Sequence, residues 1–260
     1  MTMMHNPSAE KPDYGNWVST KLLLISGLLS VLFAALSFLL PILAVGAAFF
    51  GLWFVYFLYA RHQFSPTGGN VQARIHDMVL DALDRLDWDG VGTVLDIGCG
   101  NAPLAIQVAR KYPGARVTGI DLWGMGWDYS KAACEENAEV AGVADRMTFQ
   151  KASAADIPFE DGSFDVAVSN FVFHEVRDAQ DKRDILKEAL RVVRKGGKFA
   201  FQDLFLVKQI YGDVDDLLET IRGWGVQELE FVNTSDADFV PQALKLPFMV
   251  GSTGIICGTK

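Results

Sequence analysis

The ten residues from Val94 to Pro103 read VLDIGCGNAP, and they decide the fold of this chain. The apolar start of the stretch is typical of a buried parallel strand, and the triplet Gly98-Cys99-Gly100 predicts a tight turn that opens a helix. Because its two glycines carry no side chains, the turn lets a ligand lie against bare backbone N–H groups. Asp96, near the end of the strand, is placed to hold this turn or to attract a cationic ligand.

The residues that follow the turn narrow the kind of ligand. A dinucleotide site reads G-x-G-x-x-G, but Pro103 replaces the third glycine here, and the Gly-Lys-Ser/Thr ending of a phosphate loop is absent. This favours an acidic nucleoside pocket and disfavours a nicotinamide dehydrogenase. The three cysteines (Cys99, Cys134 and Cys257) have no spacing typical of a disulfide framework or of a metal site. Cys99 is therefore either a small buried residue or a reactive thiol.

Strands and helices alternate after the turn, which predicts an α/β fold with a Rossmann-like, doubly wound, seven-stranded sheet. The predicted strands are 94–97, 117–120, 147–150, 164–169, 198–202, 227–232 and 254–258. The predicted helices between them are 102–111, 130–141, 181–193 and 213–222, with Gly196-Gly197 as a helix C-cap. Open parallel sheets bind ligands beyond the carboxyl ends of their strands, so the site is expected there.

Acidic residues stand at two of these strand ends. Asp121 closes the second strand, where a carboxylate can bind both ribose hydroxyls of a nucleoside or simply cap a helix. Asp156 follows the third strand and can accept from an adenine amino group while Ile157 packs on the ring; a plain turn aspartate is the alternative. The aromatic residues Trp123, Trp127 and Tyr129 come next to Asp121 and either wall the pocket or pack on the surface.

The whole series, from Val91 to Asp203, resembles the ubiquinone/menaquinone-biosynthesis-like branch of the class I S-adenosylmethionine (SAM) dependent methyltransferases. The matching segments are IGCGNAP, GIDLW, ADIPFEDGSFDVAVSNFVFHEV and EALRVVRKGGKFAFQD, in that order. The resemblance implies SAM as cofactor, and its expected cofactor-binding residues are Asp96, Gly98, Cys99, Gly100, Asp121, Leu122, Ala155, Asp156, Ile157 and Asn170. It covers neither the N-terminal region nor the residues after Asp203, so quinone specificity does not transfer.

Methyl transfer to a hydroxyl, phenol or carbon acceptor needs a general base, whereas a thiolate or amine needs little help. His174 is the best candidate because its intrinsic pKa lies near ~6.5. The adjacent Glu175 is expected to orient His174 or to replace it, and Asp203 is a weaker candidate for the base. A structural hydrogen bond at a helix start is the alternative role for His174.

The segment from Leu22 to Ala60 contains 39 residues without a single Asp, Glu, Lys, Arg or His. As a helix it would measure roughly 58 Å, about twice the ~30 Å of a bilayer core. Pro41 at its midpoint predicts a break, and hence a membrane hairpin of two helices. The hairpin either crosses the bilayer twice or dips in and returns. The run is too long for a signal peptide and too apolar for a soluble helix.

These features divide the chain into an N-terminal polar tail (1–21), the hairpin (22–60), a linker with an amphipathic helix (61–92) and a SAM-dependent methyltransferase domain (93–260). The formal charge of −9 belongs entirely to residues 61–260, which disfavours nucleic acid as a partner. Lys21 and Arg61 flank the hairpin, and SAM is an intracellular metabolite, so the domain is expected on the cytoplasmic side of a membrane. The sequence does not indicate an oligomeric state.

The function expected from these observations is a membrane-tethered methyltransferase that acts on a small lipophilic or membrane-delivered acceptor. An S-methyltransferase for small thiols or hydrogen sulfide is one alternative. A non-catalytic SAM-binding membrane scaffold or sensor is another. The apolar insert from Asn233 to Val250 is expected to be an acceptor-site lid, a membrane contact or ordinary packing.

Overall fold

The computed structural model describes residues 11–124, 129–247 and 249–260, which form two compact units. The smaller unit is Gly15–Ile75, and the larger unit combines 11–14 with His76–Lys260. The large unit therefore takes in chain from both sides of the small one. Residues 1–10 of the expected N-terminal tail and Trp127 lie outside the described residues.

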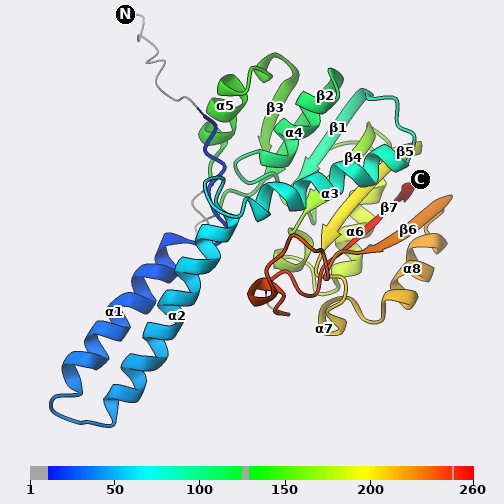
Figure 1. Cartoon of the computed structure of the whole chain (residues 1–260). Helices are drawn as coiled ribbons and strands as arrows, with labels where there is room; N and C mark the ends of the chain where they lie inside the picture. Colours follow the sequence, from blue (N-terminus) through cyan, green and yellow to red (C-terminus); the bar gives the residue numbers. More distant parts are fainter. Residues whose placement is uncertain (1–10, 125–128, 248) are drawn as a thin grey trace, which may run out of the picture. The chain divides into compact units, whose positions relative to one another are not determined.

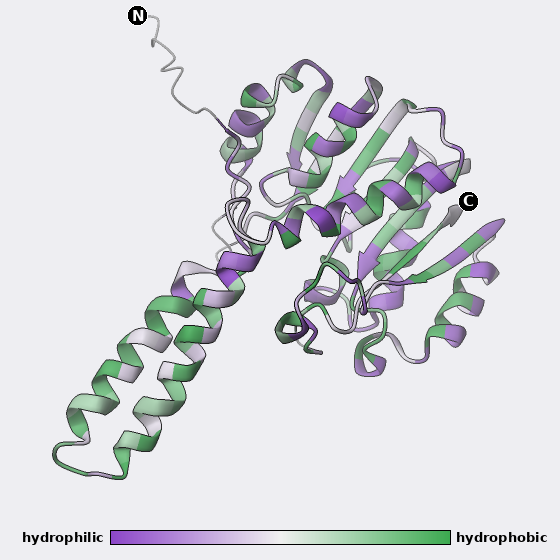
Figure 2. Cartoon of the chain, viewed as in Figure 1, coloured by the Kyte–Doolittle hydropathy of each residue, from purple (hydrophilic) through white to green (hydrophobic). Residues whose placement is uncertain are grey.

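Two apolar helices, α1 (Thr20–Leu36) and α2 (Leu43–Phe64), make up most of the small unit, and Pro41 lies in the turn between them (Figure 1). Small residues let the helices approach: a Cβ on Gly46 would lie 2.4 Å from the Phe33 ring. Ser30 Oγ also donates to the Ala47 carbonyl of the other helix at 2.9 Å. Figure 2 shows that apolar residues surround both helices, so neither has the polar face of a soluble amphipathic helix.

Only α2, with 22 residues, is both long and apolar enough to cross a membrane among the described helices. The apolar helix α1 is shorter, at 17 residues. Most of the large apolar side chains on both helices are exposed, including Leu28 at 68% and Leu52 at 73%. Such surfaces are costly in water, because burying apolar area contributes about 25 cal/mol per Å².

The large unit is built on a seven-stranded sheet with the order β3-β2-β1-β4-β5-β7-β6. The strands are β1 (Val91–Ile97), β2 (Gly114–Asp121), β3 (Met147–Lys151), β4 (Phe164–Asn170), β5 (Val193–Asp203), β6 (Glu228–Asn233) and β7 (Gly254–Thr259). Strands β1 to β5 are parallel, whereas β7 runs antiparallel to both β5 and β6. The predicted seven-stranded Rossmann-like sheet is confirmed, in a mixed form.

Helices cover both faces of the sheet. They are α3 (Val71–Arg85), α4 (Pro103–Lys111), α5 (Lys131–Val140), α6 (Lys182–Arg191), α7 (Lys208–Tyr211) and α8 (Val214–Gly223), with short 3₁₀ turns at Ala144–Arg146 (η1), Phe173–Glu175 (η2) and Gln242–Leu244 (η3). Alternate residues of each central strand face opposite cores: Val94 packs with α3, α4 and α5, and Leu95 packs with α6 and α8. This alternation follows from the period of two in a strand.

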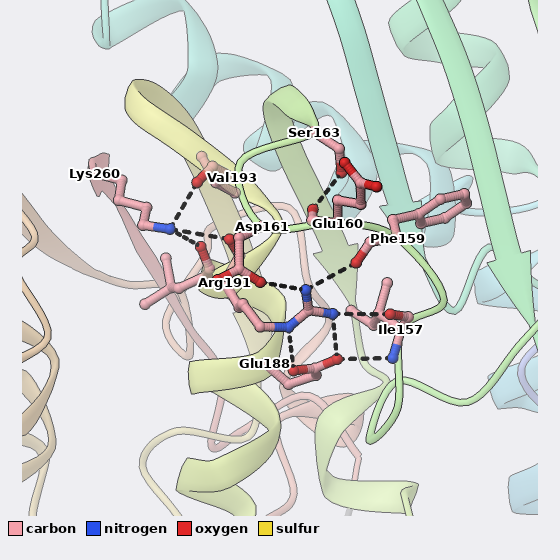
Figure 3. Close-up of polar contacts among 10 residues, drawn as sticks. Ile157, Phe159, Glu160, Asp161, Ser163, Glu188, Arg191, Val193 and Lys260 are labelled. Atoms are coloured by element: carbon pink, nitrogen blue, oxygen red, sulfur yellow. Dashed lines mark hydrogen bonds and ion pairs between the residues drawn. The ribbon is translucent and has the colours of Figure 1, made fainter.

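The predicted C-cap at Gly196-Gly197 is wrong. Helix α6 already ends at Arg191, and both glycines lie inside β5, where the pairing with β4 shifts register. A Cβ on Gly197 would lie 2.7 Å from the Asp165 carbonyl oxygen, so the close approach of β5 to β4 at this position requires glycine. Lys260 Nζ supplies the cap instead and donates to the carbonyls of Leu190, Arg191 and Val193 at 2.7, 3.1 and 2.7 Å (Figure 3).

The insert between β6 and β7 lies at the carboxyl edge of the parallel strands. Asp203, the last residue of β5, and Asn233, the last of β6, both pair with Gly254. Gln202 Nε2 donates to Thr234 Oγ1 at 3.2 Å, and Thr234 Oγ1 donates to Thr253 Oγ1 at 2.9 Å. Both ends of the insert are thus attached to β5. Its interior is packed, since Leu244 is completely buried.

Candidate active site

The glycine turn after β1 is held by the neighbouring strand β2. The N–H groups of Gly98 and Cys99 donate to the Ile120 carbonyl at 2.7 and 3.0 Å, and the N–H of Gly100 donates to Asp121 Oδ2 at 3.0 Å. These donors have acceptors inside the protein, so the expectation of bare N–H groups at the turn is wrong for these three residues. What the turn offers a ligand is a close approach to backbone without side chains.

Gly98 also joins the turn to the loop after β4. Its φ is +72°, and a Cβ at this position would lie 2.2 Å from a methyl carbon of Val172. Glycine is therefore required at position 98 for two reasons: the backbone is left-handed, and a side chain would clash with Val172. Val172 precedes His174 by two residues, so this contact connects the predicted cofactor turn with the predicted base.

Asp96 lies beneath the turn, with 1% of its surface exposed, and its Oδ2 accepts from the Ala105 N–H in α4 at 3.0 Å. Burial raises the pKa of Asp96 to about 7, and the nearby Asp121 carboxylate adds to the rise. A buried carboxyl group with this pKa is only partly ionised at neutral pH. A cation bound near it would favour the ionised form.

Cys99 occupies the centre of the turn as a buried thiol. Its sulfur would lie 2.9 Å from a Cβ on Gly119 of β2, which shows how closely it fills this space. A hydrogen bond with Cys134 and burial raise its pKa well above the ordinary value. Cys134 in turn donates to the Gly100 carbonyl at 3.0 Å. Since the thiolate is the nucleophile, these contacts favour the packing role of Cys99 over a reactive one.

Asp121 ends β2 and organises the first residues after it. Its Oδ1 accepts from the Trp123 N–H at 2.7 Å, while the indole Nε1 of Trp123 donates to the Gly100 carbonyl at 2.9 Å. Burial raises the pKa of Asp121, although these N–H donors lower it in part. Each carboxylate oxygen has a second lone pair, so Asp121 can still accept from a diol. The apolar side chain of Leu122 is 46% exposed beside it.

The loop after β3 carries Ala155, Asp156 and Ile157. Asp156 is exposed, whereas Ile157 is 2% exposed and belongs to the core. Arg191 of α6 fixes this loop by donating to the Ile157 and Phe159 carbonyls, both at 2.8 Å (Figure 3).

The same arginine pairs with Glu188, one turn earlier on α6, at 2.8 Å, and this contact lowers the pKa of Glu188. Glu188 Oε1 accepts from the Ile157 N–H at 2.8 Å. The Glu188–Arg191 pair therefore holds the backbone of Ile157 from both its N–H and its carbonyl side.

His174 follows β4 in the turn η2, and its ring is bonded to the last residue of β5. Nδ1 lies 2.7 Å from Oδ1 of Asp203, whose side chain is completely buried. Asp203 Oδ2 also accepts from the Phe173 N–H at 2.8 Å, and Oδ1 accepts from the Leu204 N–H at 2.6 Å. Backbone N–H groups thus hold the Asp203 carboxylate in place, and the carboxylate in turn orients the imidazole ring of His174. The side chain of His174 remains 21% exposed.

Two opposing effects act on the His174 ring. Burial lowers its pKa, but the charge of Asp203 and the hydrogen bond to it raise the pKa, with a further rise from Glu175, so the net direction is upward. Glu175 lies 3.9 Å from Nε2, too far for a hydrogen bond. The hydrogen bond that orients His174 is made with Asp203, while Glu175 makes a longer ion-pair contact with Nε2, and the expected role of Glu175 stays a prediction.

Asn170 ends β4, next to Gln202 of β5 in the register. The side-chain oxygen of each is buried and has no hydrogen-bond partner among the described residues. Buried amide oxygens without a donor are costly, by about 1–3 kcal/mol each. The Asn170 oxygen is therefore an open acceptor at the carboxyl edge of the sheet, the edge at which Asp121 ends β2.

Backbone strain gathers in the same loops. Ala102, Trp123 and Phe171 have positive φ angles of 66°, 44° and 57°, and they follow β1, β2 and β4 respectively. Residues without a glycine's freedom rarely adopt this conformation, and they concentrate at functional sites. The Phe171 N–H donates to the Gln202 carbonyl at 2.8 Å, which holds one of these residues in place.

The central part of the chain is similar in sequence to known methyltransferases. Residues 95–201 match a family model described as a methyltransferase domain. The O-methyltransferase resE of Aspergillus sclerotiorum is 30% identical over 58% of this chain and 61% of its own length. The 27-O-demethylrifamycin SV methyltransferase of Amycolatopsis mediterranei is 34% identical over 50% and 46%. The ubiquinone/menaquinone biosynthesis C-methyltransferase UbiE of Geotalea daltonii is 29% identical over 50% and 55%.

Solved structures share the fold at low sequence identity. The [4+2]-cyclase SpnF has a TM-score of 0.53 at 20% identity, covering 72% of this chain and 80% of its own. A geranyl diphosphate methyltransferase in complex with SAM has a TM-score of 0.53 at 18% identity, covering 76% and 93%. The match with the sequence relatives above spans roughly half of their own lengths, between 46% and 61%.

Proposed function

We propose that the chain is a class I SAM-dependent methyltransferase, with SAM as its cofactor, that methylates a small lipophilic or membrane-delivered acceptor. The proposed reaction is supported mainly by the His174–Asp203 pair at the carboxyl edge of the sheet. The proposed location at a membrane is supported by the two apolar helices α1 and α2.

Bound SAM supplies a methyl group on a positively charged sulfur, so the protein has to align the acceptor and remove its proton. Asp203 holds Nδ1 of His174, which leaves Nε2 as the nitrogen that can take this proton. A raised pKa makes the ring a stronger base, and Asp203 stabilises the imidazolium that forms. This arrangement favours a hydroxyl, phenol or carbon acceptor over a thiol, which would not need it.

The residues proposed to hold SAM lie at the carboxyl ends of β1, β2 and β4 and in the loops after β1, β2 and β3. Asp121 would accept from the ribose hydroxyls, with Gly98, Cys99 and Gly100 as the flat surface beneath them. Leu122 and the backbone of Ala155 and Ile157 would border the adenine ring, and Asp156 would accept from its amino group. Asp96 and the Asn170 side chain would face the cationic part of the cofactor.

The hairpin is proposed to attach this domain to a bilayer. At ~1.5 Å per residue, α2 measures about 33 Å, enough to cross a core of ~30 Å, and α1 measures about 25 Å. An exposed apolar surface on nearly every side of two helices suits lipid better than water. A tether of this kind would keep the active site in the layer where a lipophilic acceptor is concentrated.

A contact within the large unit supports a hairpin rather than a single span. The Asp13 N–H donates to Asn137 Oδ1 at 2.8 Å, and Asn137 Nδ2 donates to the Asp13 carbonyl at 2.8 Å. Asp13 precedes α1 and Asn137 follows α2, so both ends of the hairpin must emerge on one side of the bilayer. A single crossing by α2 would place these two residues on opposite sides.

Site-specific labelling tests this topology. The three native cysteines are buried, so cysteines introduced at Lys11, Phe38 and Glu139 can be labelled selectively with a membrane-impermeant maleimide in oriented vesicles. We expect Lys11→Cys and Glu139→Cys to react from the same side. Reaction of Phe38→Cys from the opposite side would identify two full spans, and protection from both sides would identify a re-entrant hairpin. Opposite reactivity of Lys11→Cys and Glu139→Cys would overturn the proposal.

The reaction is tested by comparing wild type with His174→Ala in detergent, using methyl-labelled SAM and a membrane extract. A base-dependent acceptor predicts a loss of label transfer of about 10²- to 10⁴-fold. Near-normal transfer by His174→Ala would contradict this mechanism and point to a thiol acceptor. Binding of SAM without any transfer by the wild type would instead support the scaffold alternative.

A further inference from the structure

The chain that precedes the hairpin runs back along the cofactor domain. Residues 11–14, here called the N-terminal strap, belong to the same compact unit as His76–Lys260, and Figure 1 shows the dark-blue part of the chain, which begins at residue 11, passing beside α5. Asp13 is joined to Asn137 of α5 through both its N–H and its carbonyl, each at 2.8 Å. Tyr14 packs against the core that includes α4 and α5.

Asn137 also reaches the glycine turn. Its Nδ2 donates to the Asn101 carbonyl at 3.0 Å, and Asn101 directly follows Gly100. Asn137 and Asn101 are 4% and 5% exposed, so both amides are removed from water. The carbonyl oxygen and both N–H hydrogens of the Asn137 amide account for the three bonds. One buried side chain thus links the strap to the predicted cofactor loop.

Gly100 and Asn101 are in turn hydrogen-bonded to other parts of the predicted cofactor pocket. Asn101 Oδ1 accepts from the Ser130 N–H at 3.1 Å, at the start of α5. The Gly100 carbonyl accepts from Trp123 and from Cys134. Loss of the strap would remove two of the three bonds that hold the Asn137 amide, and so free it to leave Asn101.

From these contacts we infer that the N-terminal strap is part of the cofactor site and that Asn137 is the residue that positions the turn at Gly98–Ala102 for SAM. This rests on the proposed function, because it concerns the affinity for that cofactor. Docking of the strap and binding of the cofactor then favour each other. By linkage, the factor by which the strap strengthens binding equals the factor by which the cofactor stabilises the docked strap.

The test uses the full chain in detergent and S-adenosylhomocysteine as the probe. Calorimetry gives its Kd for wild type, for Asn137→Ala and for a chain without residues 2–14. We expect both variants to bind about tenfold more weakly, as for loss of a buried hydrogen-bonded connection. Thr93→Val is the matched control. It removes a 2.9 Å hydrogen bond to Asp165 near the amino ends of β1 and β4, far from the predicted cofactor site, and should leave Kd unchanged.

Hydrogen exchange separates a positioning role of the strap from a plain contribution to stability. In wild type, saturating S-adenosylhomocysteine should slow exchange of the Asp13 amide, which donates to Asn137. In Asn137→Ala this protection should disappear. If the wild type binds the probe but Asp13 exchange is unaffected and Kd is the same in all variants, the strap has no role in the site. If the wild type does not bind the probe at all, the proposed function fails together with this inference.

Discussion

His174 and Asp203 are 29 residues apart in the chain, yet His174 Nδ1 lies 2.7 Å from Asp203 Oδ1. The pairing arises because β4 and β5 are adjacent parallel strands whose carboxyl ends meet at one edge of the sheet. The turn η2 after β4 turns the imidazole toward the last residue of β5. A fixed carboxylate on one ring nitrogen leaves the other for chemistry.

Replacing Asp203 by Asn should lower kcat and move its pH dependence. In wild type the pKa of His174 is raised above 6.5, so activity should increase with pH through a value above 6.5 as the ring loses its proton. Without the Asp203 charge, burial is left to lower the pKa of His174. The rise of activity with pH should therefore move to lower pH, while kcat falls about 10- to 100-fold. A pH–kcat profile measures both changes.

Glu175→Gln is the control for this profile, because Glu175 lies 3.9 Å from Nε2 and raises the pKa of His174 less than Asp203 does. Its kcat should fall less than threefold, by roughly the loss of a surface ion pair. A larger effect for Glu175→Gln than for Asp203→Asn would mean that the wrong carboxylate has been assigned to His174.

Asp96→Asn should stabilise the ligand-free protein at alkaline pH while weakening cofactor binding. The pKa of Asp96 is raised from 3.8 to about 7, so the folded state binds a proton that the unfolded state releases. The stability from this proton is complete below 3.8 and is lost as pH rises through 7. Asn avoids the buried charge and can keep the bond from Ala105.

Thermal unfolding at pH 5 and pH 8 checks the Asp96 prediction. The variant should gain Tm relative to wild type mainly at pH 8, and the gain should shrink at pH 5. Calorimetry should show weaker binding of S-adenosylhomocysteine, as expected for residues whose buried charge serves a ligand at the expense of stability. An equal change in Tm at both pH values would show that Asp96 does not carry this proton.

Gly98→Ala and Gly142→Ala form a matched pair, because both glycines have a φ of +72°. At Gly142 no atom of the described residues beyond its two chain neighbours lies within 4 Å of an added Cβ, whereas at Gly98 a Val172 methyl carbon lies at 2.2 Å. The left-handed backbone alone should cost about 1–2 kcal/mol at Gly142. The clash should make Gly98→Ala worse by at least a further ~1–3 kcal/mol. Equal losses in thermal unfolding would contradict the role of Val172.

Arg191→Lys should loosen the loop after β3 without removing charge. Arg191 reaches two carbonyls, Glu188 and Asp161 with one planar group, and a lysine cannot reproduce this geometry. We expect a loss of stability of about 1–3 kcal/mol and faster hydrogen exchange at Ile157. Weaker binding of S-adenosylhomocysteine should accompany it if Asp156 contacts the cofactor. Unchanged exchange at Ile157 would show that Glu188 holds the loop alone.

Much of the fold was predictable because it depends on local patterns. Apolar runs that end in glycine, aspartate or asparagine marked β1, β2 and β4, and the alternation of strands with helices marked α4 and α8. The antiparallel direction of β7 was not predictable, since an apolar strand such as Gly254–Thr259 carries no sign of its orientation. The misplaced cap at Gly196-Gly197 has a similar origin: a glycine pair serves a register shift as well as a helix end.

The candidate site was predictable only where it depends on strand ends. Asp121 and His174 follow strands, and this alone places them at the carboxyl edge. The hydrogen-bond partner of His174 was not predicted, because Glu175 is its neighbour in sequence while Asp203 is its neighbour in space. Asn137 carried no signal at all, since its proposed role depends on contacts with Asp13 and Asn101, both distant along the chain.

The central claim, methylation of a lipophilic acceptor at a membrane, is tested most directly by following the label. Full-length protein in nanodiscs is incubated with methyl-labelled SAM and a membrane extract, and the products are separated by organic extraction and identified by mass spectrometry. The account predicts a labelled, organic-extractable product in wild type that His174→Ala does not form. Label that enters only water-soluble products, or no transfer although SAM binds, would contradict it.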